Sequence, residues 1–460
     1  MTKDHHQVTL GSSSRVRDDL HNVTDLEEVD WTFDGFNTQQ FTHGLHPYPA
    51  RMVPQIVRAL LSYYKGEGVI EAGDLVYDPF SGSGTTAVEG RLADLNTKAN
   101  DINPLAALLT RAKASPLEPH QMKDFRDNVM DGLAADLRRT RERYDEDGES
   151  FEGIREPEVR DGWFPQPHLL ELCIIRDRIS EVESKWNDGN EDDLGRFFRV
   201  ALSKTTRKVS YQRNGEFKRY RLAEEDRETH DPNVYRIFES EVEENVGLMK
   251  EYSEQVNHDR STDVYLADSR TAEDIDTDSV DIVVTSPPYG DHGTTVAYGQ
   301  FSQDPAIVAW GRGYDEMREV DKEGLGGQNR KLEPLDTLEE WSPALEATLS
   351  TLREKDGRSE DAMEFFRDYY AVMEQVARVL KPGNPVAWVV ANRTMSRVNI
   401  PTHLITKELC EHIGFEHEYM LAREIPNKTL PWENAPENTP GVKGDLMANE
   451  NIVVMTAPEE

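Results

Sequence analysis

Residues 281–290, which read DIVVTSPPYG, constrain the fold more than any other part of the chain. Val and Ile favour a buried strand, whereas two successive prolines cannot continue one because they lack backbone N–H donors. The chain must therefore leave a sheet at Ser286, at the carboxyl end of a strand, where open α/β sheets bind ligands. Oxygen acceptors beside the ring of Tyr289 suit a planar ring with an exocyclic amine, such as a nucleobase. An ordinary strand-to-loop turn is the alternative interpretation.

The length and charge of the chain set two further limits. A chain of 460 residues exceeds one ordinary core and predicts two or three domains. The formal net charge of −35 has the sign opposite to that of most partners of nucleic acid. Either nucleic acid is not the partner, or the acid covers a surface adapted to high salt, where the Debye length of about 3 Å at 1 M screens repulsion. The scatter of Asp and Glu along the whole chain favours the second interpretation.

Several classes of protein are not expected. Cys173 and Cys410 lie far apart without metal-ligand spacing, which argues against a disulfide framework or a zinc site and for a reducing compartment. No apolar signal region follows the amino terminus, and no apolar run approaches the roughly 20 residues that span a bilayer. We therefore expect a cytoplasmic protein with no metal and no membrane partner.

A second strand ends in a glycine-rich turn at residues 75–86, which read LVYDPFSGSGTT. The strand ends at Asp78, and a helix is predicted over 85–92. Gly82 and Gly84 let the backbone approach a ligand closely, and the helix start offers free N–H groups. No lysine follows the glycines as a P-loop requires, and Asp78 would repel phosphate. The carboxylate fits a ligand that carries an ammonium or sulfonium group.

Two further aspartates are candidate ligand-binding residues. Asp101 lies about 20 residues beyond the glycine turn, where an acidic residue can hold a ribose diol, although it could instead cap the helix before Pro104. Residues 261–270 predict a short strand that ends at Asp268. Strands that end in carboxylates and alternate with helices indicate a doubly wound α/β sheet. The remaining core elements are a helix over 361–380, a strand over 385–390, a helix over 400–413, and a closing antiparallel pair at 415–423 and 451–455.

Residues 105–260 show no strand pattern and predict helices over 105–114, 121–144 and 169–186. Within this region, residues 196–221 reverse the charge of the chain and interleave basic with aromatic side chains, which fits contacts to phosphates. A solvated charged face is the alternative. The candidate nucleic-acid-binding residues are Arg207, Lys208, Arg213, Lys218, Arg219 and Arg221.

Three motifs in this order resemble those of the DNA amino-methyltransferases, in particular the cytosine-N4 kind of restriction–modification systems. The sequence DPFSGSG at 78–84 resembles the family's cofactor loop, TSPPY at 285–289 its catalytic motif, and HPYPA at 46–50 the motif that packs on the methionine part of the cofactor. Serine at position 286 is typical of cytosine-N4 enzymes, whereas Asp or Asn would suggest adenine-N6. The resemblance covers roughly 41–114 and 262–455.

The resemblance implies a Rossmann-like class I methyltransferase fold, a doubly wound sheet with an antiparallel final strand. The catalytic domain would be discontinuous, comprising 41–114 and 262–460. A polar arm would precede it at 1–40, and a mostly helical insertion would occupy 115–261. A further insertion at 291–360 would lie over the site and could serve target recognition.

The implied cofactor is S-adenosylmethionine. Residues 80–85 would line its methionine moiety, Asp101 its ribose and Asp268 its adenine amine. The cofactor-binding residues implied by the resemblance are Tyr48, Pro49, Asp78, Phe80, Ser81, Gly82, Ser83, Gly84, Thr85, Asp101 and Asp268.

The implied reaction is methylation of a cytosine flipped out of double-stranded DNA, with Ser286, Pro287, Pro288 and Tyr289 as catalytic residues. Ser286 and the Pro287 carbonyl would accept hydrogens from the amine, and Tyr289 would stack on the ring. A cognate restriction enzyme would be a further partner. Adenine-N6 or RNA methylation stays open within the enzyme class, and a non-catalytic nucleic-acid-binding protein on this fold stays open outside it.

Overall fold

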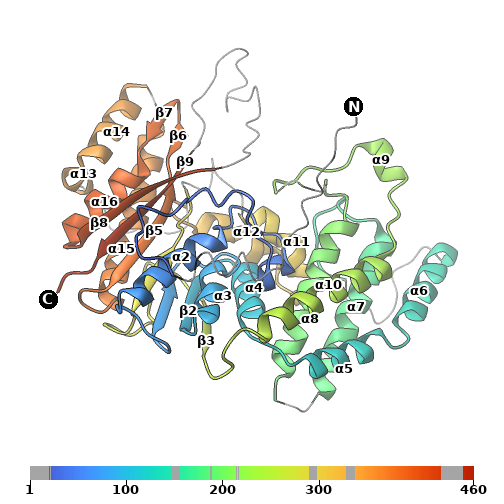
Figure 1. Ribbon diagram of the computed structural model, residues 1–460. Coiled ribbons are helices and arrows are strands. Elements are labelled where there is room, and N and C mark those ends of the chain that lie inside the picture. Colours follow the sequence, from blue (N-terminus) through green and yellow to red (C-terminus); the bar gives the residue numbers. More distant parts are fainter. Residues whose placement is uncertain are drawn as a thin grey trace, which may run out of the picture.

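A seven-stranded sheet forms the centre of the molecule (Figure 1). The computed structural model describes residues 20, 22–147, 156–186, 189–213, 215, 217–289, 298–327, 337–355, 357–425 and 449–459. The strand order is β3-β2-β1-β4-β5-β9-β8, and β9 is antiparallel to both of its neighbours. The strands are β1 (Leu75–Asp78), β2 (Asn96–Asp101), β3 (Thr262–Leu266), β4 (Ile282–Thr285), β5 (Pro385–Ala391), β8 (Glu416–Glu424) and β9 (Asn449–Thr456). The expected doubly wound sheet with an antiparallel final strand is confirmed.

The sheet is buried on both faces, which explains why its central strands are apolar without a polar face. Every residue of β4 and β5 is buried. Along β4, Ile282 and Val284 join the hydrophobic cluster of helix α2 (Pro54–Gly66), whereas Val283 joins that of helix α15 (Ser359–Val379). This alternation follows from the period of two in a strand, and it places helices on the two sides of the sheet.

The strand order reverses between β1 and β4, which makes this pair the topological switch point. The two strands run parallel, with Val76 opposite Ile282 and Tyr77 opposite Val283. Their carboxyl ends therefore meet at one edge of the sheet. The glycine-rich turn and the Ser-Pro-Pro turn leave from adjacent strands there, so both predicted strand ends lie at the same edge.

Helices complete the layers around the sheet. Short helices α3 (Thr85–Leu92) and α4 (Pro104–Ala114) follow β1 and β2, and the 3-10 helix η1 (Phe41–Leu45) precedes α2. Beyond β4 come α11 (Tyr298–Trp310), α12 (Tyr314–Glu323), α13 (Leu338–Trp341) and α14 (Pro343–Glu354), and α16 (Thr402–Ile413) follows β5. A small hairpin, β6 (Arg393–Met395) and β7 (Val398–Ile400), precedes α16.

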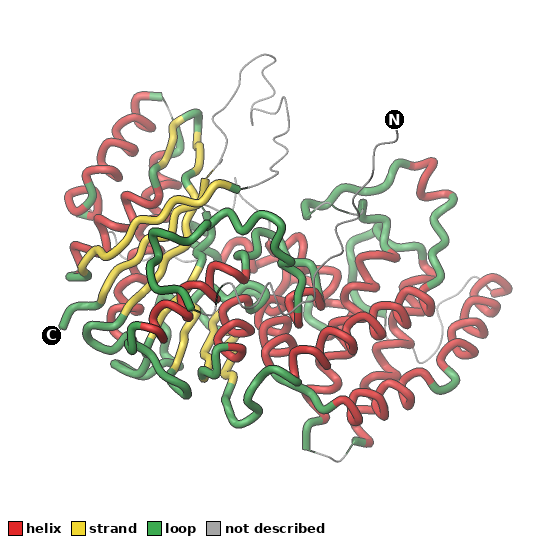
Figure 2. The backbone as a smooth tube through the Cα atoms, viewed as in Figure 1, coloured by secondary structure: helices red, strands yellow, loops and turns green. Residues whose placement is uncertain are grey.

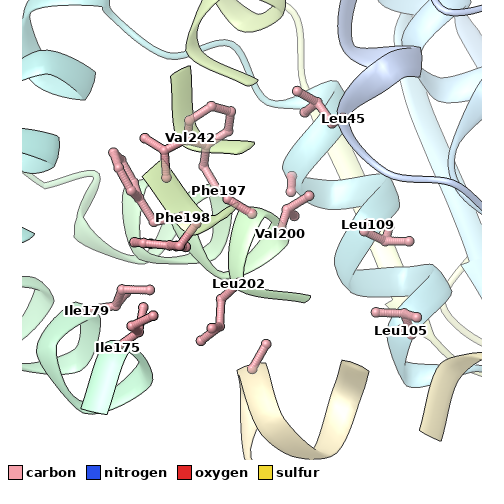
Figure 3. Packing of buried hydrophobic residues seen from close by; sticks show 14 of the residues in the cluster. Leu45, Leu105, Leu109, Ile175, Ile179, Phe197, Phe198, Val200, Leu202 and Val242 are labelled. Carbon is pink, nitrogen blue, oxygen red and sulfur yellow. The ribbon is translucent and has the colours of Figure 1, made fainter. Parts of the chain in front are cut away.

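A group of helices stands to one side of the sheet, on the right in Figures 1 and 2. It comprises α5 (Pro119–Met130), α6 (Leu133–Asp147), α7 (Gln166–Lys185), α8 (Glu191–Val209), α9 (Glu224–Glu228) and α10 (Val234–Ser253). Buried side chains of α7, α8 and α10 form one hydrophobic cluster with Leu105 and Leu109 of α4 (Figure 3). The helical group is thus attached to the sheet through α4.

Some elements differ from the sequence-based prediction. The single helix expected over 121–144 is wrong: it is divided into α5 and α6 at Gly132, whose φ of 70° lies in the left-handed region. Strand β2 and helices α8 and α10 were not predicted. The hairpin β6–β7 was also missed, because Ser396 and Arg397 turn it with φ of 47° and 60° although neither residue is a turn-forming glycine.

Among the described residues, no helix combines the length and the apolar character that a bilayer crossing demands.

Gly90 allows α3 to lie close to the sheet, and its replacement tests this packing. A Cβ at this position would lie 2.5 Å from Val76 Cγ1 and 2.8 Å from Thr97 Cγ2. We expect Gly90→Ala to lower the free energy of unfolding by about 1–3 kcal/mol, as overpacking does. Gly247→Ala is the matched control, because Gly247 also lies in a helix but has nothing within 4 Å of an added Cβ. Urea unfolding of both variants should show loss of stability for Gly90→Ala alone.

Candidate active site

Asp78 connects the two turns at the switch point. Its Oδ1 accepts from Thr285 Oγ1 at 2.6 Å and from the Phe80 backbone N–H at 3.0 Å. Thr285 is the last residue of β4, so one carboxylate holds the start of the glycine turn against the end of the neighbouring strand. Gly84 then begins α3 with φ of 86°, and a Cβ there would lie 2.8 Å from Thr110 Cα. Both the backbone conformation and the close approach require glycine.

Asp101 closes the glycine turn from the neighbouring strand. The backbone N–H of Gly82 donates to its Oδ2 at 2.9 Å, and that of Asn103 donates to its Oδ1 at 2.8 Å. The helix-cap interpretation of Asp101 is wrong, because Asn103 is the N-cap of α4 and accepts from Leu105 N. Burial raises the pKa of Asp101 to about 7 and that of Asp78 to about 6, although these hydrogen bonds act in the opposite direction.

A pocket of about 1100 Å³, open solvent at its mouth included, lies between the two turns. Most of the predicted site residues surround it. Those in its lining are Tyr48, Pro49, Asp78, Phe80, Ser81, Gly82, Ser83, Thr85, Asp101, Asp268, Ser286 and Pro288. Gly84, Pro287 and Tyr289 lie outside the lining.

Helices α11 and α12 add residues that the sequence did not point to. Tyr298, Val320, Asp321, Gly324 and Leu325 line the pocket together with Arg51, Met52, Asn103 and Val372. The ring of Tyr298 stacks on Tyr48 with centroids 5.9 Å apart, and the Gly299 N–H donates to Asp321 Oδ1 at 2.7 Å. Part of the segment expected to cover the site therefore forms a wall of the pocket. Residues 290–297, 328–336 and 356 of that segment, and 426–434 of the later loop, lie outside the described residues.

Asp268 is oriented by an arginine. The guanidinium of Arg270 donates through Nε to its Oδ1 at 3.0 Å and through Nη2 to its Oδ2 at 2.9 Å. Arg270 also pairs with Asp368 of α15 at 2.6 Å, and Asp368 accepts from the Gly326 N–H at 2.9 Å. This network ties the end of β3 to the segment after α12, so it fixes one side of the pocket.

Ser286 begins a short hydrogen-bonded chain at the end of β4. Its hydroxyl lies 3.0 Å from the Val389 carbonyl oxygen and 3.2 Å from the Tyr289 hydroxyl. The Tyr289 hydroxyl donates to Glu450 Oε1 at 3.1 Å, and the other oxygen of Glu450 pairs with Arg423. Neither Glu450 nor Arg423 was a predicted site residue, because both lie on the closing strands, far from the motifs in sequence.

The basic stretch divides into an inner and an outer part. Three of its candidate residues contact aromatic or acidic side chains of α10 and α11. The guanidinium carbon of Arg207 lies 4.0 Å from the centroid of Phe301, and burial lowers the pKa of Arg207 to about 10. Lys208 pairs with Glu241, and Arg219 pairs with Asp304 at 2.9 Å. These cations hold α8 and the following loop against α10 and α11.

The outer part faces solvent. Arg213, Lys218 and Arg221 are exposed, and so are the rings of Phe217 and Tyr220. An antiparallel bridge between Gln212 and Arg221 brings the two ends of this loop together. Phe217 in turn contacts Phe301 of α11, with ring centroids 5.8 Å apart. The loop that carries these exposed side chains therefore contacts α11 through Phe217, and α11 also carries Tyr298 into the pocket.

The pocket fits the cofactor that the sequence implied. Asp78, Asp101, Asp268 and Asp321 line it, and their carboxylates suit an ammonium, a sulfonium, a ribose diol and an adenine amine. Phe80, Leu325 and Val372 add apolar surface of the kind that small-molecule sites present to a ring. No group of three or more His, Cys, Asp or Glu side chains that could hold a metal ion occurs in the part of the chain that the structure describes.

Comparison of the sequence with curated proteins finds Type II methyltransferases. The Type II methyltransferase M.MvaI of Kocuria varians is 34% identical over 429 residues, which cover 91% of this chain and 92% of that protein. The Type II methyltransferase M.MjaII of Methanocaldococcus jannaschii is 32% identical over 101 residues, covering 21% and 18% of the two chains. No family model matches the chain.

Solved structures give weaker likenesses. A chain from Thermus thermophilus, described as a candidate DNA modification methylase, has a TM-score of 0.20 at 19% identity and covers 42% of this chain and 52% of its own. The rRNA methyltransferase aviRa from Streptomyces viridochromogenes has a TM-score of 0.30 at 9% identity, covering 89% and 88%. Scores this low add nothing to the argument.

The sheet, its switch point and the pocket define a methyltransferase with a Rossmann-like fold. Since M.MvaI is similar over nine-tenths of both chains, the protein belongs to the Type II methyltransferases, enzymes that modify DNA with S-adenosyl-L-methionine as methyl donor.

The raised pKa of Asp101 predicts how stability depends on pH in the absence of cofactor. Its pKa of about 7 in the folded protein exceeds the unfolded value of 3.8, so folding favours the protonated form. The stabilisation that protonated Asp101 gives the folded protein is complete below about pH 4 and is lost as the pH rises towards 7. We expect Asp101→Asn, which cannot ionise, to lose less free energy of unfolding between pH 4 and 7 than the unmodified protein. Urea unfolding at several pH values measures this, with the exposed Asp124→Asn as control; equal losses in all three proteins would contradict it.

Proposed function

We propose that the protein transfers a methyl group from S-adenosylmethionine to the exocyclic N4 amine of a cytosine flipped out of double-stranded DNA. The observation that carries the proposal is the position of Ser286, which lies in the pocket wall beside the glycine turn of the adjacent strand. Because Thr285 binds Asp78 across the two strands, the cofactor turn and the serine turn keep a fixed separation. A flipped base at Ser286 would thus lie close to the methyl donor.

The residues after β4 suit an amine rather than a carbonyl on the target ring. Ser286 can accept through its oxygen, and the Pro287 carbonyl has no N–H on its own residue to compete with it. Accepting both amine hydrogens draws the nitrogen lone pair out of conjugation with the ring. Tyr289 would stack on the base, which contributes about 1–3 kcal/mol. Serine in this position is what favours cytosine-N4 over adenine-N6.

The remaining pocket residues would hold the cofactor. In the proposed arrangement, Tyr48, Pro49 and residues 80–85 contact the methionine moiety, Asp101 holds the ribose diol and Asp268 accepts from the adenine amine. When bound, the cofactor supplies a methyl group activated by its sulfonium. The protein contributes mainly by holding the target nitrogen in line with that group, which needs no protein nucleophile.

DNA would approach along the exposed part of the basic stretch. Arg213, Lys218 and Arg221 could contact phosphates, while Arg207, Lys208 and Arg219 hold the loop in place through the internal contacts described above. The acidic remainder of the surface would repel DNA elsewhere and limit binding to this face. The proposal places the protein in the cytoplasm as part of a restriction–modification or host-protection system, with a cognate restriction enzyme as a further partner.

Nucleoside mass spectrometry of DNA methylated by the purified protein tests the proposed target. We expect N4-methylcytosine as the product, formed at a defined site. Methyladenine alone would reject the cytosine assignment, and DNA binding without any methylated nucleoside would favour a non-catalytic binding protein. Methylated RNA without methylated DNA would reject the DNA substrate.

Ser286→Ala tests the proposed acceptor. The variant removes one oxygen that contacts the target amine, so we expect turnover to fall about 10²-fold or more, the range found when one preorganised hydrogen-bonding group is removed from an active site. Cofactor affinity, measured by calorimetry, should stay within about twofold, because Ser286 is not among the proposed cofactor contacts and changes at independent sites have little effect on each other. Ser180→Ala, at an exposed position of α7, serves as control. An equal loss of cofactor affinity and turnover would show that the assigned role is wrong.

Arg213→Ala and Lys218→Ala test the proposed DNA surface. Each removes one exposed cation, so each should weaken DNA binding regardless of sequence and reduce the slope of log K against log[salt] by about 1. Lys250→Ala is the matched control, since Lys250 is an exposed cation of α10 outside the basic stretch. Unchanged salt slopes in the first two variants, measured by fluorescence anisotropy, would place the DNA elsewhere.

A further inference from the structure

We propose that Glu450 is a positioning residue that fixes the direction of the hydrogen bonds leading to Ser286, so that Ser286 offers only acceptor oxygen to the target base. Glu450 lies on β9, in register with Ala391 of β5 on one side and with Arg423 of β8 on the other. The inference deepens the proposed function and depends on it, because it assumes that a base amine binds at Ser286.

The chain of contacts runs from Ser286 to a carboxylate. Ser286 Oγ lies 3.2 Å from the Tyr289 hydroxyl, which lies 3.1 Å from Glu450 Oε1. The second oxygen of Glu450 pairs with Arg423, whose side chain is 5% exposed, compared with 15% for Glu450. Ser286 Oγ also lies 3.0 Å from the carbonyl oxygen of Val389 on β5. The Ser286 hydroxyl thus contacts two groups of defined hydrogen-bonding character: a carbonyl of β5 and a tyrosine hydroxyl that a carboxylate of β9 holds.

The chemistry of these groups permits only one direction for the hydrogen bonds between them. An ionised carboxylate only accepts, so the single hydrogen of the Tyr289 hydroxyl goes to Glu450. Tyr289 then presents oxygen lone pairs to Ser286, and the Val389 carbonyl also presents lone pairs. The hydrogen of Ser286 is therefore donated within the protein, and its own lone pairs remain for an incoming donor. Burial and the Glu450 charge raise the pKa of Tyr289 well above its usual value, so the phenol keeps its hydrogen.

This arrangement favours a target ring that carries an amine over one that carries a carbonyl. An amine has hydrogens to give to Ser286, whereas the carbonyl of uracil or thymine at the same position has none. Two facing acceptors repel and leave both buried groups without a partner, which is costly. Glu450 would thereby contribute to discrimination between cytosine and uracil although it does not touch the base.

Glu450→Gln reverses the direction of the hydrogen bonds that link residue 450, Tyr289 and Ser286. The neighbouring arginine enforces this reversal. Arg423 is a donor only, so it attracts the amide oxygen of the glutamine and leaves the amide NH₂ facing Tyr289. Tyr289 then accepts from the glutamine and turns its hydrogen towards Ser286, where it occupies one of the serine lone pairs. The variant keeps the size of the side chain and changes only the direction in which these hydrogen bonds run.

The first experiment compares steady-state methylation and binding of duplexes that carry cytosine or uracil at the target position. We expect Glu450→Gln to lower kcat about tenfold, to leave cofactor affinity unchanged, and to reduce the preference for cytosine over uracil about tenfold, corresponding to one lost hydrogen bond. Glu416→Gln, an exposed neutralisation at the start of β8, is the control. A mispaired uracil flips out more easily than a paired cytosine. This difference is the same for every variant, so it cancels when the ratio of binding to cytosine and uracil duplexes is compared between variants. An unchanged kcat and ratio in Glu450→Gln would overturn the proposal.

A second set of variants separates this role from a purely structural ion pair. In a Tyr289→Phe background, which removes the connecting hydroxyl, Glu450→Gln should have no further effect on kcat or on discrimination. Glu450→Asp, which keeps an acceptor-only carboxylate, should retain discrimination. A full effect of Glu450→Gln without the Tyr289 hydroxyl, or loss of discrimination in Glu450→Asp as large as in Glu450→Gln, would overturn the proposal.

The folding of the variants and the identity of the base are controlled separately. If Glu450→Gln loses cofactor binding, the double variant Glu450→Met, Arg423→Met removes both charges together, a change that buried ion pairs often tolerate. It also leaves Tyr289 free to donate to Ser286, so the same loss of discrimination is expected, and full retention would overturn the proposal.

If the unmodified protein methylates adenine, the proposed target fails. The same Glu450 comparison is then made on the adenine amine, where no effect of Glu450→Gln would overturn the inference.

Discussion

The parallel pairing of β1 with β4 is the constraint on which the rest of the structure depends. It brings two turns, separated by about 200 residues of chain, to one edge of the sheet, and the hydrogen bond from Thr285 to Asp78 spans 207 positions. Since prolines end one strand and glycines follow the other, neither chain can continue across the edge. The pocket is the space that these two interrupted strands leave.

The way in which its carboxylates are held is a second feature of the site. Asp78 is buried and Asp101 is half-buried, and each accepts hydrogen bonds from backbone or hydroxyl groups of the turns and the strand ends beside them. Asp268 instead has an arginine, Arg270, which also binds Asp368. The pocket therefore contains carboxylates of two kinds: those held by dipoles, whose ionisation burial opposes, and one paired with a full positive charge.

The sequence predicted the sheet well because its signals are local. The ends of β1 and β4, the start of α3 and the antiparallel pair β8–β9 follow from proline, glycine and runs of β-branched residues. The interruption at Gly132 and the start of α10 at Asn233 have local signals, a glycine and an N-cap, that the prediction passed over, whereas no glycine marks the hairpin at Ser396 and Arg397. The composition of the basic stretch likewise did not reveal that Arg207 lies over Phe301, or that Lys208 and Arg219 pair with carboxylates of neighbouring helices.

By itself, the sequence determined which residues leave the sheet and what chemistry they bring: a carboxylate and glycines at one turn, a serine and prolines at the other. Only the tertiary structure decided what surrounds them, including Tyr298 and Asp321 in the pocket wall and Glu450 behind Tyr289. The reason is physical. Motif chemistry depends on residues that adjoin along the chain, whereas burial, ion pairing and hydrogen-bond direction depend on partners that the fold brings from distant positions.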